Sequence, residues 1–548
     1  MLPLPIGIEN FQETINKYYV DKTMLIKDIV LTNLYSAVLI TRPRRFGKSL
    51  AISMLETFFS DEIDGNQYFK DKKISHNWEE YNNYLNKYPV IHLNMKNIQA
   101  NDIDALYDLI DLEISKIYIK NYDRISSHLS KDELKNVELL MAQKAPLSLL
   151  MNSVELLTLY INKATGKKPI LLIDEYDTPI QVAHDNGYYK QAISFFKTFY
   201  TSALKGNNNL TLAVVTGVMQ ISKESSFSGL NNLRVYSVID NKLSSYFGFT
   251  ELEVKEMLNY YHIEEPIEKI NKYYGGYLFG NTKLYNPWSI LNFIDNDAKY
   301  RFYWKNSGTN HLLLGENNQA NDVLIEIYGE DTIYVQINNS LSYNDIQNSK
   351  EAYYSFLLQC GYLTVAEESN NNYFKITKPN LEASDAFKTE IIDRYFNGGK
   401  LFLPLELKNA LANKDDYKIK QLFEKYILSS FSYFDYKNEK NYQILTLGIM
   451  AVLFDDSIVK SEVNSTNGRA DIVISPKNEN EIGVVLEIKY SKTIISKQRL
   501  TALTEKGLKQ IKDHHYTQGL IERKANPILI YSFAFDGEHI NVLSEKVR

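Results

Sequence analysis

The stretch from residue 37 to residue 50 limits the possible folds more than any other part of this chain. An apolar, β-branched run leads into a loop that ends in Gly47-Lys48-Ser49, and a helical pattern follows at once. This order is typical of a phosphate-binding loop, because backbone N–H groups and the helix N-terminus face the anion. Lys48 supplies a mobile positive charge, and Ser49 offers a hydroxyl to Mg²⁺. Arg42 stands where the general pattern has its first glycine.

A second motif complements this loop. The apolar run at 170–174 ends in Asp174 and is followed by Glu175. A buried strand of this kind delivers one carboxylate to the Mg²⁺ shell, here beside Ser49, and the next carboxylate to the attacking water. Each motif alone has a plain explanation, a basic helix cap in the first case and a common strand end in the second. Together, in this order on parallel strands, they predict nucleotide binding, with ATP as the ligand.

Further polar residues surround the predicted loop. Thr216 ends the next apolar strand, where it either senses the γ-phosphate or simply begins a turn. Arg42, Arg44 and Arg45 crowd the loop, so that one of them pairs with phosphate or the group forms an exposed basic patch. The candidate nucleotide-binding residues are Arg44, Arg45, Phe46, Gly47, Lys48, Ser49, Asp174 and Thr216.

The first half of the chain has the pattern of an α/β domain. Apolar runs at 37–41, 89–93, 170–174 and 212–216 are each followed by helix-compatible sequence, which predicts a parallel sheet covered by helices. Leu, Ile and Met recur periodically over 102–163, so a helical insertion is expected between the second and third strands. Helical patterns from 251 to about 295 predict a small helical lid.

The middle of the chain resembles a winged helix. A helical pattern ending near Gln359 precedes two short strands at 361–365 and 373–377, with a polar loop at 370–372 between them. Such modules bind DNA in some proteins and serve as packing in others, and no residue suited to direct base readout decides between the two. The expected domains are 1–245 (ATPase), 246–300 (lid), 301–412 (winged-helix-like) and 413–548 (C-terminal domain).

A second chemical site is predicted near the C-terminus. Asp471 lies in one strand-like run, and Glu487 and Lys489 lie in the next. Alternate residues of a strand share a face, so Glu487 and Lys489 project together and the neighbouring strand brings Asp471 close. Two carboxylates can hold Mg²⁺ or Mn²⁺, and a lysine can position water and stabilise charge during phosphodiester hydrolysis. We expect all three side chains in a solvent-accessible cleft, with Glu462 as a further metal ligand.

This second pattern also has simpler explanations. An Asp followed by Glu-x-Lys is a loose motif, and a surface hairpin with alternating charge would look the same. His514 and His515 are expected to face solvent rather than to bind metal, and Cys360 is expected to pack in the helix before Gly361.

The chain resembles bacterial AAA-ATPase-like proteins that carry a C-terminal PD-(D/E)XK nuclease domain. The resemblance implies an α/β P-loop ATPase with a helical lid and a restriction-endonuclease-like C-terminal domain, and an arginine at position 42 is usual in that family. Gln510 and Tyr516, on a predicted helix, match the Gln and Tyr of RecB-like superfamily members, which gives Gln510 a catalytic role. The motifs that carry the resemblance are 19–23, 42–49, 173–177, 226–232 and 285–289, continuing to the C-terminus.

Length and composition limit the number of domains, the mode of nucleic-acid binding and the cell compartment that we expect. A chain of 548 residues predicts several domains, and its net charge of -6 means that nucleic-acid binding must rest on local basic patches. Its single cysteine, Cys360, fits a reducing compartment. No signal peptide or membrane-spanning run is recognisable, so we expect a cytoplasmic protein without a membrane partner.

The leading hypothesis is an ATP-licensed nuclease that acts on DNA, with defence or mobile-element biology as an analogy only. The alternative is an ATP-driven switch whose nuclease-like domain only binds a protein or nucleic-acid partner. RNA is a further option, because nothing in the sequence reads a 2′-hydroxyl. A homo-oligomer is compatible with either hypothesis.

Overall fold

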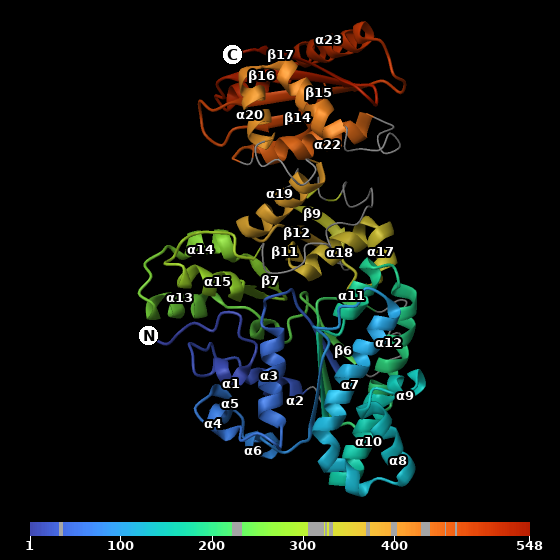
Figure 1. Ribbon diagram of the computed structural model, residues 1–548. Helices are drawn as coiled ribbons and strands as arrows, with labels where there is room; N and C mark the ends of the chain where they lie inside the picture. Colours follow the sequence, from blue (N-terminus) through green and yellow to red (C-terminus); the bar gives the residue numbers. More distant parts are fainter. Residues whose placement is uncertain are drawn as a thin grey trace. The chain divides into compact units, whose positions relative to one another are not determined.

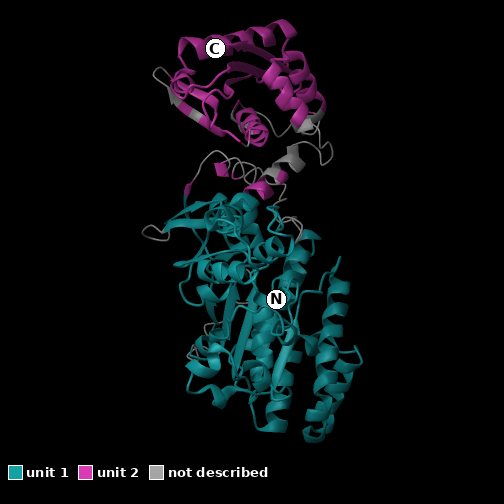
Figure 2. Ribbon diagram, turned by 90° about the vertical axis from the view of Figure 1, so that its left-hand side faces the viewer, with its two compact units in different colours: residues 1–310, 334–383 teal, residues 311–333, 384–548 magenta. Residues whose placement is uncertain are grey.

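The computed structural model places most of the chain in two compact units. Unit 1 comprises residues 1–310 and 334–383, and unit 2 comprises residues 311–333 and 384–548 (Figure 2). The structure describes residues 1–31, 37–221, 233–304, 323, 326–327, 332–368, 373–395, 403–428, 439–454, 456–465 and 468–548.

A five-stranded parallel sheet in the order β2-β3-β4-β1-β6 forms the centre of unit 1. Its strands are β1 (Ala37–Thr41), β2 (Val90–Asn94), β3 (Ile170–Asp174), β4 (Leu212–Gly217) and β6 (Leu233–Tyr236). Every residue of β1, β3 and β4 is buried, which explains why these strands read as continuous apolar runs. The predicted α/β fold is confirmed. β4 lies between β1 and β3, so Thr216 lies between the ends of the two strands that carry the motifs.

Helices cover both sides of this sheet. In Figure 1, α3 (Lys48–Phe59) lies on one side, and α7 (Ile103–Ile125) and α12 (Tyr189–Leu204) lie on the other. The predicted insertion between the second and third strands is helical, and capping boxes or side-chain caps begin two of its helices. Besides α7 it comprises α8 (Lys131–Met141), α9 (Leu147–Met151) and α10 (Ser153–Thr165).

Three helices and a hairpin form the lid. They are α13 (Glu251–Tyr260), α14 (Ile267–Tyr274), the hairpin β7 (Tyr277–Phe279) and β8 (Thr282–Leu284), and α15 (Pro287–Asp295). Buried side chains of the three helices form one apolar cluster, against which Tyr18 and Val20 of the N-terminal segment pack. Lys22 of that segment donates to Glu253 of α13 at 2.7 Å, so the segment and the lid are joined.

The predicted helix and hairpin of the middle segment are present. The helix is α18 (Lys350–Cys360), and β11 (Thr364–Glu368) pairs antiparallel with β12 (Tyr373–Thr377) in a sheet that also contains β9 (Ile333–Gln336). The predicted loop at 370–372 lies outside the described residues. Every residue from Ala352 to Cys360 is buried, whereas a helix that reads bases must expose one face. This burial favours the packing role of the segment.

Unit 2 contains a second five-stranded sheet, in the order β13-β14-β15-β16-β17, in which β15 and β16 are parallel and the other neighbours antiparallel. One face packs against an apolar cluster that includes α22, and the other against a cluster that includes α23. The elements are α20 (Leu403–Asn413), α21 (Asp416–Leu422), α22 (Glu439–Leu453), β13 (Ile458–Ser465), β14 (Gly468–Ser475), β15 (Gly483–Tyr490), α23 (Lys497–Asp513), α24 (Gln518–Glu522), β16 (Ile528–Phe535) and β17 (Ile540–Lys546).

Shorter elements complete the described chain. They are α1 (Phe11–Thr14), α2 (Met24–Val30), α4 (Asn66–Phe69), α5 (Lys73–Asn77), α6 (Tyr81–Tyr84), η1 (Ser126–His128), α11 (Thr178–Asp185), β5 (Gln220–Ile221), η2 (Ser244–Tyr246), β10 (Ser340–Leu341), α17 (Tyr343–Asn348), α19 (Leu381–Tyr395) and η4 (Phe423–Ile427). Among the described helices, none is both long and apolar enough to cross a membrane.

Candidate functional site

The loop after β1 has the backbone that its sequence predicts. Gly47 caps α3 in the left-handed region, at φ 87°, where a side chain would be strained. Lys48 is buried and its Nζ donates to the carbonyl oxygens of Arg42 and Pro43, each at 3.1 Å. Burial lowers the pKa of Lys48, while Glu175 and other nearby carboxylates oppose the shift. The lysine is therefore satisfied by its own loop and must exchange these bonds to bind a phosphate.

The predicted acids follow β3 as expected. Asp174 is buried, and its Oδ1 accepts hydrogen bonds from the Thr216 hydroxyl at 2.5 Å and from the Glu175 amide at 3.0 Å. The Thr216 hydroxyl is therefore hydrogen-bonded to the Asp174 carboxylate. Glu175 adopts a φ of 51° and accepts from the Thr178 hydroxyl at 3.2 Å. Burial raises the pKa of Glu175 and Lys48 opposes this, as expected for a carboxylate in the same site as the lysine.

Asp177 has a structural role that the sequence did not indicate. It is buried, and its Oδ2 accepts from the amides of Val218 at 2.8 Å and Met219 at 3.0 Å. These bonds fix the turn after β4. The Asp177 carboxylate is thus occupied by hydrogen bonds from backbone amides. Of the two acids, Glu175 is the one placed for contact with water.

Arg42 differs from its neighbours in the loop. Its side chain is 0% exposed, donates from NH1 to the carbonyls of Thr41 at 2.8 Å and Tyr236 at 2.9 Å, and lies over the rings of Phe247 and Phe279. Burial lowers its pKa to about 10, so the guanidinium stays charged at neutral pH. The alternative in which Arg42 belongs to an exposed basic patch is therefore excluded, because its contacts tie β1 to β6 and to the lid hairpin.

Arg44, Arg45 and Phe46 line a cavity of about 400 Å³. Arg44 donates to Gln181 at 3.2 Å, and Arg45 lies over the ring of Trp288 at 4.4 Å, so neither side chain forms a detached basic patch. The cavity has a polar end and an apolar end. Its polar end includes Lys48, Ser49, Lys96 and Glu175, and its apolar end includes Ile8, Tyr18, Val20, Phe249, Trp288 and Leu291.

The apolar end of this cavity was missed by reasoning from the sequence. Its residues come from the N-terminal segment and the lid, far from the loop in sequence. The motifs at 19–23 and 285–289 are the signal that could have located them. The related motif at 226–232 lies outside the described residues.

In unit 2 the structure brings the predicted acids and lysine together. Glu487 and Lys489 lie on β15, and Lys489 Nζ donates to Glu487 Oε1 at 2.8 Å. The β14–β15 ladder reaches the Ile472–Leu486 pair, and beyond it Asp471 Oδ2 accepts from the Ile488 amide at 2.7 Å. An oxygen of the Asp471 side chain thus takes the place of a backbone acceptor at the end of the β14–β15 pairing, next to Glu487.

Glu487 is buried more deeply than we expected. Its side chain is 2% exposed, against the prediction that all three side chains lie in an accessible cleft. The cause is α23, whose Gly507 lies directly over it. Burial and the neighbouring Asp471 raise the pKa of Glu487 from its ordinary value of 4.5 to about 7. Burial lowers the pKa of Lys489, but the bond and charge of Glu487 outweigh it, so that pKa is raised.

The remaining predicted residues have different positions. Gln510 lies one turn after Gly507 on α23, and its Nε2 donates to the Tyr516 hydroxyl at 3.3 Å rather than to the acids. His514 is partly exposed and hydrogen-bonded to Tyr516, and His515 is exposed. Glu462 lies on β13, but its side chain is outside what the structure describes.

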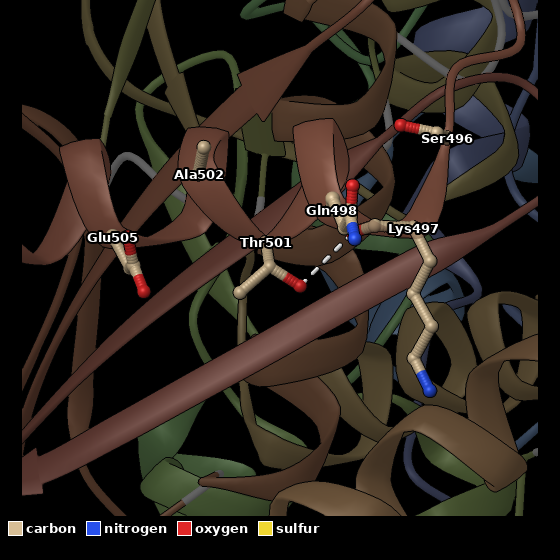
Figure 3. Close-up of a pocket in the computed structure, with 6 residues that line it drawn as sticks. All are labelled: Ser496, Lys497, Gln498, Thr501, Ala502 and Glu505. Atoms are coloured by element: carbon tan, nitrogen blue, oxygen red, sulfur yellow. Dashed lines mark hydrogen bonds between the residues drawn. The ribbon is translucent and has the colours of Figure 1, made fainter.

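Gln443 of α22 is a neighbour that the sequence did not reveal. Its Nε2 lies 3.3 Å from Asp471 Oδ1. Among the described residues, no group of three or more His, Cys, Asp or Glu side chains is arranged to hold a metal. A surface hollow of about 600 Å³ runs along the start of α23 but includes none of the predicted site residues (Figure 3). Among the described side chains, Asp471 and Glu487 are the two carboxylates that lie together at this site.

Comparison with known proteins agrees with these two sites. Residues 5–227 match the family model described as a predicted AAA-ATPase, and residues 437–545 match the PD-(D/E)XK nuclease superfamily. The chain carries an AAA-ATPase-like domain and a PD-(D/E)XK nuclease-superfamily domain. A relative from Azotobacter chroococcum mcd 1, described as an uncharacterized protein in the vnfD 5′ region, is 26% identical over 408 residues, which cover 72% of this chain and 70% of that protein. The AAA-ATPase-like match includes the loop after β1, and the PD-(D/E)XK match includes β14 and β15.

Proposed function

We propose that this protein binds and hydrolyses ATP and that its PD-(D/E)XK domain hydrolyses phosphodiester bonds of DNA with the help of a divalent cation. One observation carries the second activity: Glu487 has one oxygen bound by Lys489 while its buried Oε2 has no hydrogen-bond partner among the described residues. An unpaired buried carboxylate oxygen is costly, and a cation beside Asp471 would offset that cost.

The nucleotide site supports the first activity through its arrangement of charges. Lys48 would exchange the carbonyls of Arg42 and Pro43 for phosphate oxygens, while Ser49 and Asp174 would hold Mg²⁺. Glu175 would orient the attacking water and accept a proton from it. The apolar end of the cavity around Trp288 would take the base.

At the second site the residues fit Mg²⁺ or Mn²⁺, since both ions prefer oxygen ligands and Asp471 and Glu487 supply carboxylates. When bound, such an ion polarises a phosphoryl oxygen and lowers the pKa of water. Lys489, held in place by Glu487, would orient the attacking water and stabilise the developing negative charge. Gln443 would hold Asp471 in its position.

ATP binding is tested with Lys48→Ala and Glu175→Gln. Lys48→Ala should abolish measurable ATP binding, since a neutral side chain cannot compensate the phosphate charge, and Glu175→Gln should bind ATP without turnover. Exposed Lys205→Ala and Glu138→Gln are matched controls. Unchanged affinity in Lys48→Ala would refute the loop assignment.

The nuclease activity is tested by a cleavage panel of linear, circular and single-stranded DNA and of RNA, with Mg²⁺ or Mn²⁺ and with or without ATP. Asp471→Ala, Glu487→Ala and Lys489→Ala should each eliminate cutting, and the exposed Asp513→Ala should not. Cutting that survives in Asp471→Ala would show that another site is responsible.

The deep burial of Glu487 supports a second candidate, an ATP-driven switch whose nuclease-like domain only binds a partner. This candidate predicts that wild type cuts no substrate in the panel at any metal concentration, although nucleic acid or a protein partner still binds. Metal-dependent cutting abolished by Asp471→Ala would refute it.

A further inference from the structure

Ser532 of β16 lies directly beside Glu487 in the parallel register of β15 and β16. Paired positions of neighbouring strands place their side chains on the same face of the sheet. Ser532 is 0% exposed, and its Oγ has no hydrogen-bond partner among the described residues. Glu487 Oε2 has the same two properties. Two unpaired oxygens therefore occupy adjacent buried positions.

Such a pair calls for a physical reason. A buried polar atom without a partner is destabilising, and most buried polar side-chain atoms in native proteins have a partner. Apolar residues at position 532 would avoid this cost, as Ile530 does two residues earlier on the same face. The hydroxyl is therefore better explained by a ligand that it shares with Glu487.

Gly507 lets α23 approach these two side chains closely. A Cβ at this position would lie 2.1 Å from Ser532 Oγ and 3.6 Å from Glu487 Cγ, so both side chains reach the same point under α23. Glycine inside a helix is destabilising relative to alanine. Glycine is needed at position 507 because any side chain there would collide with Ser532.

We propose that the Ser532 hydroxyl oxygen is a third protein ligand of the divalent cation bound by Asp471 and Glu487, an inference that rests on the function proposed above. Two carboxylates and one neutral hydroxyl form a hard oxygen set suited to Mg²⁺ or Mn²⁺. The competing explanation is that Ser532 is small only to let α23 pack closely. That role requires small volume but not an oxygen.

The first test measures Mn²⁺ binding to the full chain by calorimetry, without nucleotide or nucleic acid. Ser532→Ala should weaken Mn²⁺ binding at least tenfold, since loss of one liganding or supporting group typically costs 10–100-fold. Thr446→Val is the matched control, because Thr446 on α22 also has a buried hydroxyl without a partner among the described residues but belongs to the helix against the other face. It should bind Mn²⁺ as wild type does.

The second test separates a ligand from a packing residue. Ser532→Cys nearly preserves volume and introduces a soft sulfur, which favours Cd²⁺ over Mn²⁺ only if position 532 contacts the ion. The variant is made with Cys360→Ser to remove the single native thiol. We expect the ratio of Cd²⁺ to Mn²⁺ affinity to rise at least tenfold, with a sulfur-to-cadmium ultraviolet band that disappears when Glu487 is also replaced by Ala.

The outcomes distinguish this inference from the proposed function. If Asp471→Ala and Glu487→Ala bind Mn²⁺ as tightly as wild type, the cation site itself is refuted. If those two variants lose Mn²⁺ while Ser532→Ala keeps it, or if Ser532→Cys shows no Cd²⁺ preference, only the role of Ser532 is refuted. Amide exchange of β15 and β16 in each variant shows whether the sheet has remained folded.

Discussion

The raised pKa of Glu487 predicts how the stability of unit 2 changes with pH in the absence of metal. The folded-state pKa of about 7 lies above the ordinary value of 4.5 expected for the unfolded chain, because burial and Asp471 disfavour the charged form. The folded state therefore binds an additional proton between these values. Its stabilising effect is fully present below pH 4.5 and is lost as the pH rises toward 7.

The magnitude follows from the size of the shift. Stability should fall by up to ~1.4 kcal/mol per pH unit inside this window, and by about 3 kcal/mol across it. Glu487→Gln has no proton to lose, so this contribution disappears. The variant should be less sensitive to pH than wild type between pH 5 and 7, and more stable than wild type at pH 8.

Hydrogen exchange in EDTA is the appropriate assay, since a chain of two units does not unfold in one step. Protection of amides in β15 and β16, corrected for the intrinsic rate at each pH, reports the opening free energy of unit 2. Peptides from β1 and β4 serve as the internal control. Wild-type protection that stays constant from pH 5 to 8, or that falls equally in Glu487→Gln, would refute the reasoning.

Three further predictions test other parts of the structure. Arg42→Ala should destabilise unit 1 by about 3 kcal/mol or more, because it unpairs the buried carbonyls of Thr41 and Tyr236, and unchanged chemical unfolding would contradict this. Gly468→Ala should cost about 1–3 kcal/mol in urea unfolding, because Gly468 has a φ of 156° and a Cβ there would lie 2.6 Å from His514; a neutral effect would refute the strain. Lys48→Ala should change the rate of DNA cleavage at saturating Mg²⁺ and ATP if nucleotide state controls the nuclease, whereas equal rates for wild type and variant with ATP, ADP and no nucleotide would show independent sites.

The parts of the fold that could be predicted are those recorded in local sequence. The strands at 37–41 and 170–174 have the predicted bounds, since strands buried on both faces must be continuously apolar. The alternation of Glu487 and Lys489 about a buried Ile488 follows from the period of a strand, and the structure shows the contact that it implies. In both cases the cause lies within a few residues of the motif.

The parts that could not be predicted depend on contacts between distant segments. The sequence grouped Arg42 with Arg44 and Arg45 as a possible phosphate partner or part of a basic patch, but contacts with Tyr236 and Phe279 determine its position. Likewise, nothing in the sequence around Ser532 indicates that it lies beside Glu487, because only the parallel pairing of β15 and β16 makes them neighbours. Sheet order is a tertiary property, and a single sequence does not record it.

The two sites share a physical feature that relates their structure to ligand binding. Lys48 is buried and the Lys489 side chain is 15% exposed, and both are satisfied by neighbouring oxygens, two carbonyls in the first case and Glu487 in the second. A phosphate at the first site must replace the two bonds of Lys48, so binding energy is spent on rearrangement before any chemistry occurs. At the first site Lys48 exchanges the two carbonyl acceptors of its own loop for phosphate oxygens. At the second site Glu487 Oε2 has no hydrogen-bond partner in the described part of the chain, so a cation gains an interaction there without breaking one. This difference leads us to expect that nucleotide binding reorganises its loop, whereas cation binding leaves the geometry of β14 and β15 nearly unchanged.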